Sequence, residues 1–516
     1  MTVDAVVIGS GPNGLVAATV LARAGWSVEV LERSAVAGGA VGSDVTDRGY
    51  VHDWGSAFYG VLHTSPVLRE LGLDVRLPWA HTGTPVAATW DGGTAVMRRS
   101  VDATAEGLGP DGPAWLELVA WWHRLGVPLF GAMLGPVGAP LPLLRAAARL
   151  SGPREGVQTA RMLLEPVEAW VAQQFRGDQA RMLFAANATH ADVAVDAAGS
   201  TPPAMLLAMA AQVHGMPVPV GGAARLAEAL VEAAEEAGVV VRTGVDVTRV
   251  VVRRGRAVGV VTADGEGVPA RRAVVADVAP GVLARDLVGE QHLPGEWLAQ
   301  LRRHRYTSGY FRVDVDLDRP APWADERLAD SVVVHLTGDL DELAMSQAEV
   351  RRDRLPTHPQ LILGQQDRAD PTRVPPGAAS LWVECHCPAR PRDEAEDWGA
   401  RFAERVLDRL ERSAPGLREA VVDLTVTSPL DLERRNPNLV GGDVGGGSAA
   451  PDQLLVFRPV AGWSSYALPV RGLWMCGAAS HPGGGVHGQC GRNAAKAILR
   501  RARLGLGSAA SPDDGW

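Results

Sequence analysis

Residues 4–32 change their hydrophobic period twice, and each change marks the boundary of an element. The β-branched run ending at Ile8 predicts a buried strand, and the following apolar positions recur at helical spacing to about Ala24. Gly25 interrupts this helix, and alternating apolar residues then predict a second strand that ends at Glu32. The pattern therefore predicts a β–α–β unit near the N-terminus.

A second periodic region lies near the middle of the chain. Residues 224–238, ARLAEALVEAAEEAG, predict a helix, and the VVVR that follows predicts a strand. Residues 245–262 have the apolar alternation of a β-hairpin, with Arg254-Gly255 as the turn. This region has the same mixture of helix and strand as the N-terminal unit.

Residues 301–430 carry alternating strands beside a charged helix. The runs YFRVDVDLD (310–318) and SVVVHL (331–336) predict strands, and a charged helix is expected near 391–412. Alternation of this kind is typical of a sheet that is covered on one face only. A second sheet is therefore expected here.

Composition limits the class of protein. A chain of 516 residues with 46% hydrophobic content forms more than one domain, or one large domain with an insertion. The net charge of −9 supplies no overall positive field, so we expect no nucleic-acid partner. Four cysteines are too few for a disulfide scaffold, and the first residues lack a signal-peptide pattern. We expect a cytoplasmic protein.

An uncharged stretch, Leu125 to Leu144, has about the length of a membrane span. It contains four prolines, and each interior proline removes a backbone donor, so a continuous spanning helix is not expected. Two interpretations stay open. The stretch is an irregular buried connection, or it is an apolar lid, a substrate channel or a shallow peripheral contact with a membrane.

The turn of the N-terminal unit has the spacing of a dinucleotide-binding loop. Gly9 permits a tight turn, Gly11 lets the backbone approach a pyrophosphate, and Gly14 lets the helix pack closely on the strand. The helix N-terminus offers N–H groups to the anion. Glu32, at the end of the second strand, can accept hydrogen bonds from a ribose.

One dinucleotide is expected, because no second strand–GxGxxG–helix unit follows. Gly38-Gly39 leaves room for a second close approach of backbone to a long cofactor. The absence of a CxxC pair argues against a disulfide reductase. Cys385, His386 and Cys387 lie in the alternating run SLWVECHC, so we interpret them as structural residues of a strand and expect no metal site.

A second glycine-rich stretch, HPGGGVHGQCGRNAA, lies at 481–495, after the strand pattern GLWMCG. Its glycines stand where backbone would slide against a flat ring, since a β-carbon would occupy the place of the cofactor. A helix is expected after Gly488, and its N-terminus would stabilise negative charge on a reduced flavin. The stretch therefore predicts the redox end of a flavin site, with Gly484 and Gly485 against the ring and Val486 at its edge.

Four stretches resemble, in order along the chain, the phytoene-desaturase-like FAD-dependent oxidoreductases: VVIGSGPNGLVAATVLARAGWSVEVLER with Gly38-Gly39, PVGGAARLAEALVEAAEEAGVVVRTGVDVTRVVV, NPNLVGGDVGG, and LWMCGAASHPGGGVHGQCGRNAA. The resemblance covers nearly the whole chain and is closest to the branch called pyridine nucleotide-disulfide oxidoreductase domain proteins. That name conflicts with the missing redox cysteines and the missing second nucleotide unit.

The resemblance implies an α/β fold, with a Rossmann-type FAD-binding domain of the glutathione-reductase and amine-oxidase type and an inserted α+β substrate domain. FAD-binding segments are expected at 1–78, 213–292 and 439–506. Substrate-domain parts are expected at 79–212, which is helical and contains the apolar stretch, and at 293–438, and a disordered tail at 507–516. The resemblance also implies that Val247 contacts the adenine region through its backbone and that Ala276-Asp277 closes the second FAD segment.

The residues expected to bind FAD are thus Gly9, Gly11, Pro12, Asn13, Gly14, Glu32, Arg33, Gly38, Gly39, Ala40, Val247, Gly477, Ala478, Gly484, Gly485 and Val486. A small apolar substrate is expected. The abundant apolar contact area around Trp115, Trp121 and Trp122 has two interpretations: a pocket for such a molecule, or, slightly favoured, a helix that packs its apolar stripe onto the sheet. His487 is the first candidate for proton transfer and Tyr59 the second.

The favoured function is transfer of a hydride from an apolar or natural-product-like substrate to flavin N5, with oxygen, a quinone or another acceptor taking the electrons. Flavin-dependent isomerisation and amine oxidation stay open, because fold does not choose among reactions. A protein that binds a lipid or partner without turnover is the alternative from another class. The sequence leaves the oligomeric state and the electron acceptor open.

Overall fold

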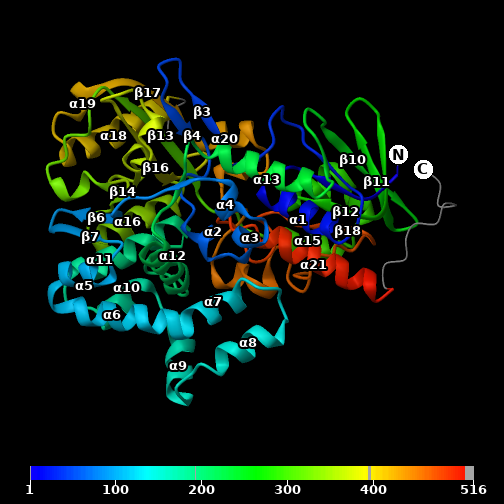
Figure 1. Ribbon diagram of the computed structural model, residues 1–516, viewed down its shortest axis with the longest axis horizontal. Coiled ribbons are helices and arrows are strands. Elements are labelled where there is room, and N and C mark those ends of the chain that lie inside the picture. Colours follow the sequence, from blue (N-terminus) through cyan, green and yellow to red (C-terminus); the bar gives the residue numbers. More distant parts are fainter. Residues whose placement is uncertain (1, 192, 393–396, 506–516) are drawn as a thin grey trace.

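The computed structural model describes residues 2–191, 193–392 and 397–505. The expected tail at 507–516 lies outside these described residues. Figure 1 shows two halves, each built around one sheet. The right half in this view gathers the blue N-terminal elements, the green middle ones and the red C-terminal helix, so segments far apart in sequence lie side by side. The protein has an α/β fold.

The first sheet has seven strands in the described chain. They are β1 (Val3–Ile8), β2 (Val28–Leu31), β9 (Val240–Arg242), β10 (Val247–Arg253), β11 (Arg256–Thr262), β12 (Gly267–Ala276) and β18 (Leu473–Met475). Their order is β10-β11-β12-β1-β2-β9, and β18 pairs with β12. The strands β1, β2, β9, β12 and β18 run parallel, whereas β10, β11 and the start of β12 form antiparallel ladders.

Local sequence explains these elements. The β–α–β unit is confirmed, with α1 (Pro12–Arg23) between β1 and β2. The hairpin β10–β11 turns at Arg254 and Gly255, whose φ angles of 48° and 72° are those of a two-residue hairpin turn. The helices α1, α13 (Ala224–Glu236) and α21 (Gln489–Arg503) bury apolar faces on one side of the sheet. The predicted helices at 224–238 and after Gly488 are thus confirmed.

The second sheet also has seven strands in the part of the chain that the structure describes. They are β6 (Thr84–Trp90), β7 (Gly93–Met97), β13 (Gly309–Leu317), β14 (Ser331–Leu336), β15 (Leu361–Gly364), β16 (Ala379–Cys387) and β17 (Val421–Thr427), in the order β17-β13-β16-β15-β14-β6-β7. Two short ladders pair β3 (Ser43–Val45) with β4 (Val51–Asp53) and β5 (Trp79–Ala80) with β8 (Val218–Pro219).

Helices cover both faces of the second sheet. One face packs on α18 (Trp398–Ser413) and α19 (Leu417–Ala420). The other packs on helices that Figure 1 shows beneath the sheet: α6 (Gly112–Trp121), α10 (Val167–Gln174), α11 (Asp178–Ala185) and α12 (Thr201–His214). The remaining helices are α2 (Gly60–Thr64), α3 (Pro66–Glu70), α4 (Leu73–Arg76), α5 (Val101–Gly107), α7 (Val127–Met133), α8 (Pro140–Ala147), α9 (Pro153–Met162), α14 (Pro280–Val282), α15 (Gly295–Leu301), α16 (Leu340–Val350), α17 (Gln366–Ala369) and α20 (Pro429–Arg435).

The expectation of a sheet covered on one face is wrong. The strands at 310–318 and 331–336 and the charged helix α18 are present, but every residue of β13, β14 and β16 is buried. The polar positions of β13 face protein: the His52 ring on β4 lies 2.6 Å from Asp316 and 3.7 Å from Asp314. Alternation alone does not reveal that another part of the chain covers the polar side.

Residues 79–212 differ from expectation in their first part. Residues 79–97 form strands instead of helices, because an apolar run is followed by an Asp91-Gly92-Gly93 turn, and β6 joins β14 in parallel. The other strands of that sheet come from 309–427. Whether the boundaries at 78, 212, 292 and 438 delimit functional domains stays a prediction.

The apolar stretch Leu125 to Leu144 is broken, as its prolines predict. It consists of a π-helical turn, α7, a loop at 134–139 and the start of α8. Within the described residues, no helix is long and apolar enough to cross a membrane. Burial is only partial, since Leu125 and Phe130 are buried whereas Leu141, Leu143 and Leu144 are exposed. The nearby Trp115 and Trp122 are buried among helices, as packing residues are.

A buried aspartate connects the two halves. Asp53, at the end of β4, is 0% exposed; its carboxylate accepts hydrogen bonds from the Ala223 N–H and the Ser43 hydroxyl. Its Oδ2 lies 2.8 Å from Nη1 of Arg373, which is also buried. The backbone oxygen of Asp53 accepts bonds from the side chain of Arg312 on β13 and of Trp382 on β16. One residue thus ties the start of the helix α13 to the second sheet.

Asp53→Asn should lower the free energy of unfolding by about 3 kcal/mol, because the buried Arg373 guanidinium then keeps only the Asp370 carboxylate, 3.5 Å away, as a charged partner. Glu236→Ala, which breaks an exposed pair with Arg76, is the control and should cause no measurable loss. Urea denaturation of both variants checks this. A loss for Asp53→Asn as small as that of the control would contradict the role of Asp53.

Candidate cofactor site

A cavity of about 1080 Å³ opens where the first sheet meets the segment before β18. Of the residues expected to bind a cofactor, those lining it are Gly9, Gly11, Pro12, Asn13, Glu32, Arg33, Gly39, Ala40, Val247, Gly477, Ala478, Gly484, Gly485 and Val486. Gly14 and Gly38 are not among its lining residues. Three stretches that are distant in sequence therefore converge on one cavity.

The glycines are required mainly by contacts of the chain with itself. A β-carbon on Gly14 would lie 2.3 Å from the Gly9 oxygen, and one on Gly39 would lie 2.8 Å from the Gly11 α-carbon. Gly38, with φ of 127°, would place a β-carbon 2.6 Å from that of Ala227. These approaches are closer than a side chain allows. Gly14 and Gly38 thus allow the close packing around the glycine turn without lining the cavity themselves.

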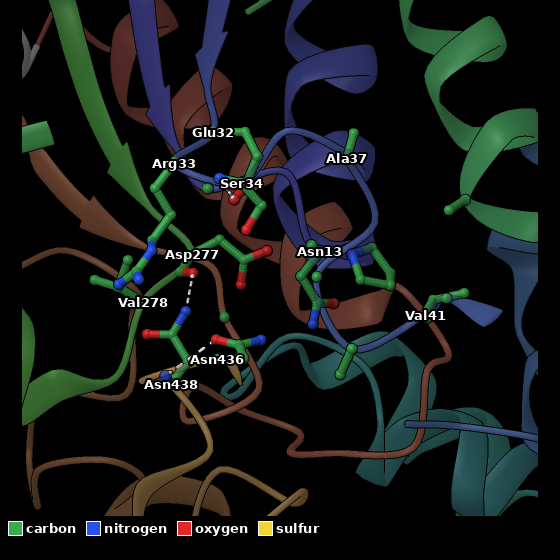
Figure 2. A pocket seen from close by; sticks show the side chains of 18 of the residues that line it. Asn13, Glu32, Arg33, Ser34, Ala37, Val41, Asp277, Val278, Asn436 and Asn438 are labelled. Atoms are coloured by element: carbon green, nitrogen blue, oxygen red, sulfur yellow. Dashed lines mark hydrogen bonds between the residues drawn. The ribbon is translucent and has the colours of Figure 1, made fainter. Parts of the chain in front are cut away.

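Three hydrogen bonds hold the Glu32 carboxylate in place, two from Ser10 in the glycine turn and one from the backbone N–H of Ser34. Its Oε2 accepts hydrogen bonds of 2.8 Å from both the backbone N–H and the hydroxyl of Ser10, and its Oε1 accepts one of 2.8 Å from the Ser34 N–H. Oε1 can still accept another bond, whereas the Ser10 bonds use both lone pairs of Oε2. Figure 2 shows Glu32, Arg33 and Ser34 together at one end of the pocket. Ser10 is a positioning residue that the glycine spacing did not indicate.

Asp277 lies at the centre of the pocket view in Figure 2. Its Oδ2 accepts a hydrogen bond of 2.8 Å from the N–H of Gly14, in the first turn of α1. Burial, together with the nearby charge of Glu32, raises the pKa of Asp277 to about 7, against the bond from Gly14. The resemblance implied that Asp277, with Ala276, closes the second FAD segment, but it did not indicate the bond with Gly14.

Asparagines from the second half close the opposite side of the pocket. Asn438 accepts a hydrogen bond of 2.8 Å from the Ala279 N–H and donates one of 3.4 Å to the Asp277 backbone oxygen. Asn436 lines the same wall and receives a bond from the Asn438 N–H. The motif NPN was the signal for these residues, but the motif does not tell which strand it meets. Figure 2 shows both asparagines facing Asp277.

A cluster that the sequence did not indicate lies at another edge of the cavity, where two exposed charged residues meet a buried tryptophan. The Arg435 guanidinium lies 4.2 Å from the centre of the Trp54 ring and forms an ion pair with Asp44. All three residues line the cavity. Arg435 directly precedes the NPN motif, so the short segment 435–438 forms both this edge of the cavity and the side near Asp277.

The glycine triplet has two different requirements. Gly485 has φ of 121°, a conformation that side chains rarely adopt, whereas a β-carbon on Gly484 would lie 2.8 Å from the α-carbon of Gly445. Both glycines are open to the cavity. The backbone here thus presents no side chain to a bound ring.

The loop that Gly484 touches is fixed by a buried arginine. The Arg458 guanidinium, 1% exposed, donates hydrogen bonds to the backbone oxygens of Gly445, Gly447, Ser448 and Ala478. The Asp443 carboxylate accepts bonds from N–H groups of the same loop and from that of Thr307. Residues 443–448 are therefore fixed by hydrogen bonds, and Val444 and Gly446 of this loop line the cavity.

The two residues expected to transfer protons do not line the cavity. His487 is 3% exposed, and its Nδ1 accepts a hydrogen bond of 3.0 Å from the Gln489 N–H. Burial lowers the pKa of His487 to about 4. Tyr59 is 1% exposed, its hydroxyl bonds Ser56, and burial raises its pKa. Catalysis by either stays a prediction, and these contacts favour positioning roles.

A polar cluster not foreseen from the sequence lies on the second sheet. Tyr310 and His386 are cross-strand partners with ring centres 4.4 Å apart, and the Tyr310 hydroxyl donates to the His190 backbone oxygen. His190 and His335 are joined through their Nε2 atoms at 2.8 Å. Glu384 lies two residues from His386, on the same face of β16. Tyr310 packs against Trp54, which places the cluster next to the cavity wall.

The side chain of Glu384 has no hydrogen-bond or ion-pair partner among the described residues, although the residue is only 9% exposed. Burial raises its pKa to about 8. Cys385 and Cys387, between these polar residues, are buried on the other face of the sheet, against Phe311 and the helix α18. Alternation along β16 thus separates the thiols from the acid and the imidazole, as expected of a strand.

The comparisons define the class of protein to which this fold and cavity belong. The model of the family described as flavin containing amine oxidoreductase matches residues 13–375, which is more than half of the chain. The chain therefore belongs to that family. It is a flavin-dependent oxidoreductase.

The relatives are of two kinds. The chain is 30% identical to the pyridine nucleotide-disulfide oxidoreductase domain-containing protein 2 of Mus musculus, over 96% of this chain and 93% of that protein. It is 29% identical to the hydroxyneurosporene desaturase of Cereibacter sphaeroides, over 96% and 97%. The resemblance to phytoene-desaturase-like oxidoreductases is confirmed.

A solved structure supports the fold. An oxidoreductase from Methanosarcina mazei superposes with a TM-score of 0.62 at 16% identity, covering 96% of this chain and 99% of that one. At this identity the likeness concerns the fold alone. The expected α/β fold of the flavoprotein type is confirmed.

Glu384→Gln should make the protein less sensitive to alkaline pH. A carboxyl whose pKa rises from 4.5 in the unfolded chain to about 8 in the folded one stabilises the fold fully below pH 4.5. That stability is lost as the pH rises through 8. At pH 9 the variant should therefore be more stable than the wild type, relative to pH 5, by on the order of 2–4 kcal/mol.

Denaturant titrations at both pH values check this difference. Glu404→Gln, with a side chain that is 64% exposed, is the matched control and should follow the wild type. Parallel pH profiles for the wild type and Glu384→Gln would show that Glu384 ionises normally.

Proposed function

We propose that the protein is a dehydrogenase that binds FAD and takes a hydride from an apolar or natural-product-like substrate. The convergence of the Gly9–Gly14 turn, Glu32 and the Gly484–Val486 backbone on one cavity is the observation that carries the proposal. Bound FAD would supply an acceptor for the hydride at N5, and would pass the electrons to oxygen, a quinone or another acceptor. Everything else in the reaction depends on how the chain holds the two molecules.

The choice of FAD over FMN rests on the far end of the cavity. Beyond the glycine turn it continues along Glu32, Val245 and Val247, where only an adenosine half would reach. The fixed Glu32 carboxylate would accept bonds from the ribose hydroxyls, and the backbone of Val247 would contact the adenine region. The Gly484–Val486 backbone would lie against the isoalloxazine ring.

The proposed substrate class rests on the relatives and on the apolar stretch. One relative is named as a desaturase, an enzyme of the reaction type proposed here. The backbone oxygens of Leu134 and Gly135 accept hydrogen bonds from Asn493 and His481, beside the glycine triplet. We assign residues 125–144 to an apolar entrance near the flavin end. Peripheral membrane contact by the exposed leucines is not needed for this role.

Oxidation of a C–N bond is the second candidate, because the matched family is described as an amine oxidoreductase. Double-bond isomerisation and binding without turnover are further outcomes of the experiments. His487 would support the reaction by fixing the start of α21 through its bond from the Gln489 N–H, and Tyr59 by fixing Ser56 in the segment before α2.

The purified protein should contain FAD, identified by chromatography after heat release. Glu32→Ala should weaken binding of added FAD by about 2–4 kcal/mol, since bonds to a charged acceptor contribute about 1.5–3 kcal/mol each. Glu404→Ala, on α18 and not among the residues that line the cavity, is the control. Release of FMN, or failure of the apoprotein to take up FAD, would contradict the assignment.

A long conjugated polyene and a primary alkylamine should be mixed separately with the holoprotein without oxygen. Loss of the oxidised flavin absorbance with the polyene is expected for the dehydrogenase. Bleaching by the amine alone would favour the second candidate. A flavin that dithionite reduces but that no probe of either class bleaches, while both probes bind, would favour a protein without turnover.

A further inference from the structure

The side chain of Asp277 lies inside the glycine turn rather than behind it. A β-carbon on Gly11 would lie 2.6 Å from its Oδ2, and one on Gly477 would lie 2.8 Å from its Oδ1. The Asp277 N–H donates to the Ile8 oxygen, so the residue cannot shift without disturbing the β1–β12 ladder. The carboxyl is thus fixed at the point where the three segments meet, on the wall of the cavity.

The N-terminus of α1 has fewer free donors than its motif implies. Pro12 has no N–H, and the N–H of Gly14 already bonds Asp277. A pyrophosphate at this helix end would normally receive such N–H groups. The Asp277 carboxyl therefore occupies the region where the anion would be bound.

No cation neutralises Asp277 in the described structure. Its Oδ2 bonds only the Gly14 N–H, and its Oδ1 has no hydrogen-bond partner among the described residues. The charged or titratable groups around it are Glu32 at the end of β2, Arg33 in the same pocket, Cys476 after β18 and Cys490 on α21. Arg33 forms no ion pair with it, and Glu32 repels it.

We propose that Asp277 binds the FAD pyrophosphate as a neutral carboxylic acid, so that cofactor binding takes up one proton and weakens with rising pH. This inference rests on the proposed binding of FAD. The acid would keep its acceptor bond from Gly14 through Oδ2 and donate its proton from Oδ1 to a phosphate oxygen. The ionised form would instead place a third negative charge beside the two of the pyrophosphate.

The direction of the pH dependence follows from linkage. The free protein already holds the pKa of Asp277 near 7, by burial and by Glu32, and a bound dianion would raise it further. The dissociation constant should be constant while free Asp277 is protonated and should then rise by about tenfold for each pH unit. The pKa values of Cys476 and Cys490 are raised, so neither thiol contributes below pH 9.

FAD titrations of the apoprotein from pH 5.5 to pH 9, followed by flavin fluorescence, test this inference. The wild type should show the rise, and Asp277→Asn, which cannot ionise, should bind with an affinity that does not change with pH. Glu32→Gln is the comparison variant in the same pocket: it should bind more weakly and keep the tenfold slope, but the rise should begin at a lower pH, because the Glu32 charge helps to raise the pKa of Asp277.

Calorimetry at pH 8 in two buffers of different ionisation enthalpy gives a second readout. Uptake of about one proton is expected for the wild type and none for Asp277→Asn. If Asp277→Asn does not fold, the wild-type slope and proton uptake still decide. FAD binding without either effect would overturn this inference alone, whereas absence of FAD binding at every pH would overturn the proposed function.

Discussion

The cavity exists because backbone meets backbone with no side chains between. Gly9 and Gly14 touch within the turn, Gly39 touches Gly11, and Gly484 touches Gly445, each at a separation that a β-carbon would prevent. These contacts bring residues from both ends of the chain to the edge of the first sheet, beside its parallel strands. Because the shape is made by close contact and not by flexible side chains, the site depends on the registers of β1, β12 and β18.

Local patterns were sufficient for the elements that hold the cofactor half together. The change from period 2 to helical spacing predicted β1, α1 and β2. The Arg254-Gly255 pair predicted the β10–β11 turn, and both residues have positive φ angles there. The glycine spacing and the family resemblance likewise indicated fourteen of the residues that line the pocket. Such features depend on residues that are close in sequence, so they can be predicted from a single sequence.

What the sequence could not give depends on distant parts of the chain. The alternating pattern of β13 predicted a solvent-exposed polar face, but His52 packs against that face. Asn438 bonds Asp277, which is 161 positions away in the sequence. His487 follows the glycine triplet in sequence, but its ring is buried and accepts a hydrogen bond from the Gln489 N–H, so it does not line the cavity. A polar residue in an alternating strand has the same pattern whether water or protein faces it.

Arg458 has a consequence for the order of events at the site. Four backbone oxygens share one guanidinium, so moving the Gly445–Ser448 loop would leave a buried charge and several carbonyls without partners. These bonds belong to the fold itself, and they fix the cavity wall at Gly446. Ligands meet a preorganised surface, and the entropy lost in ordering that loop belongs to folding instead of binding.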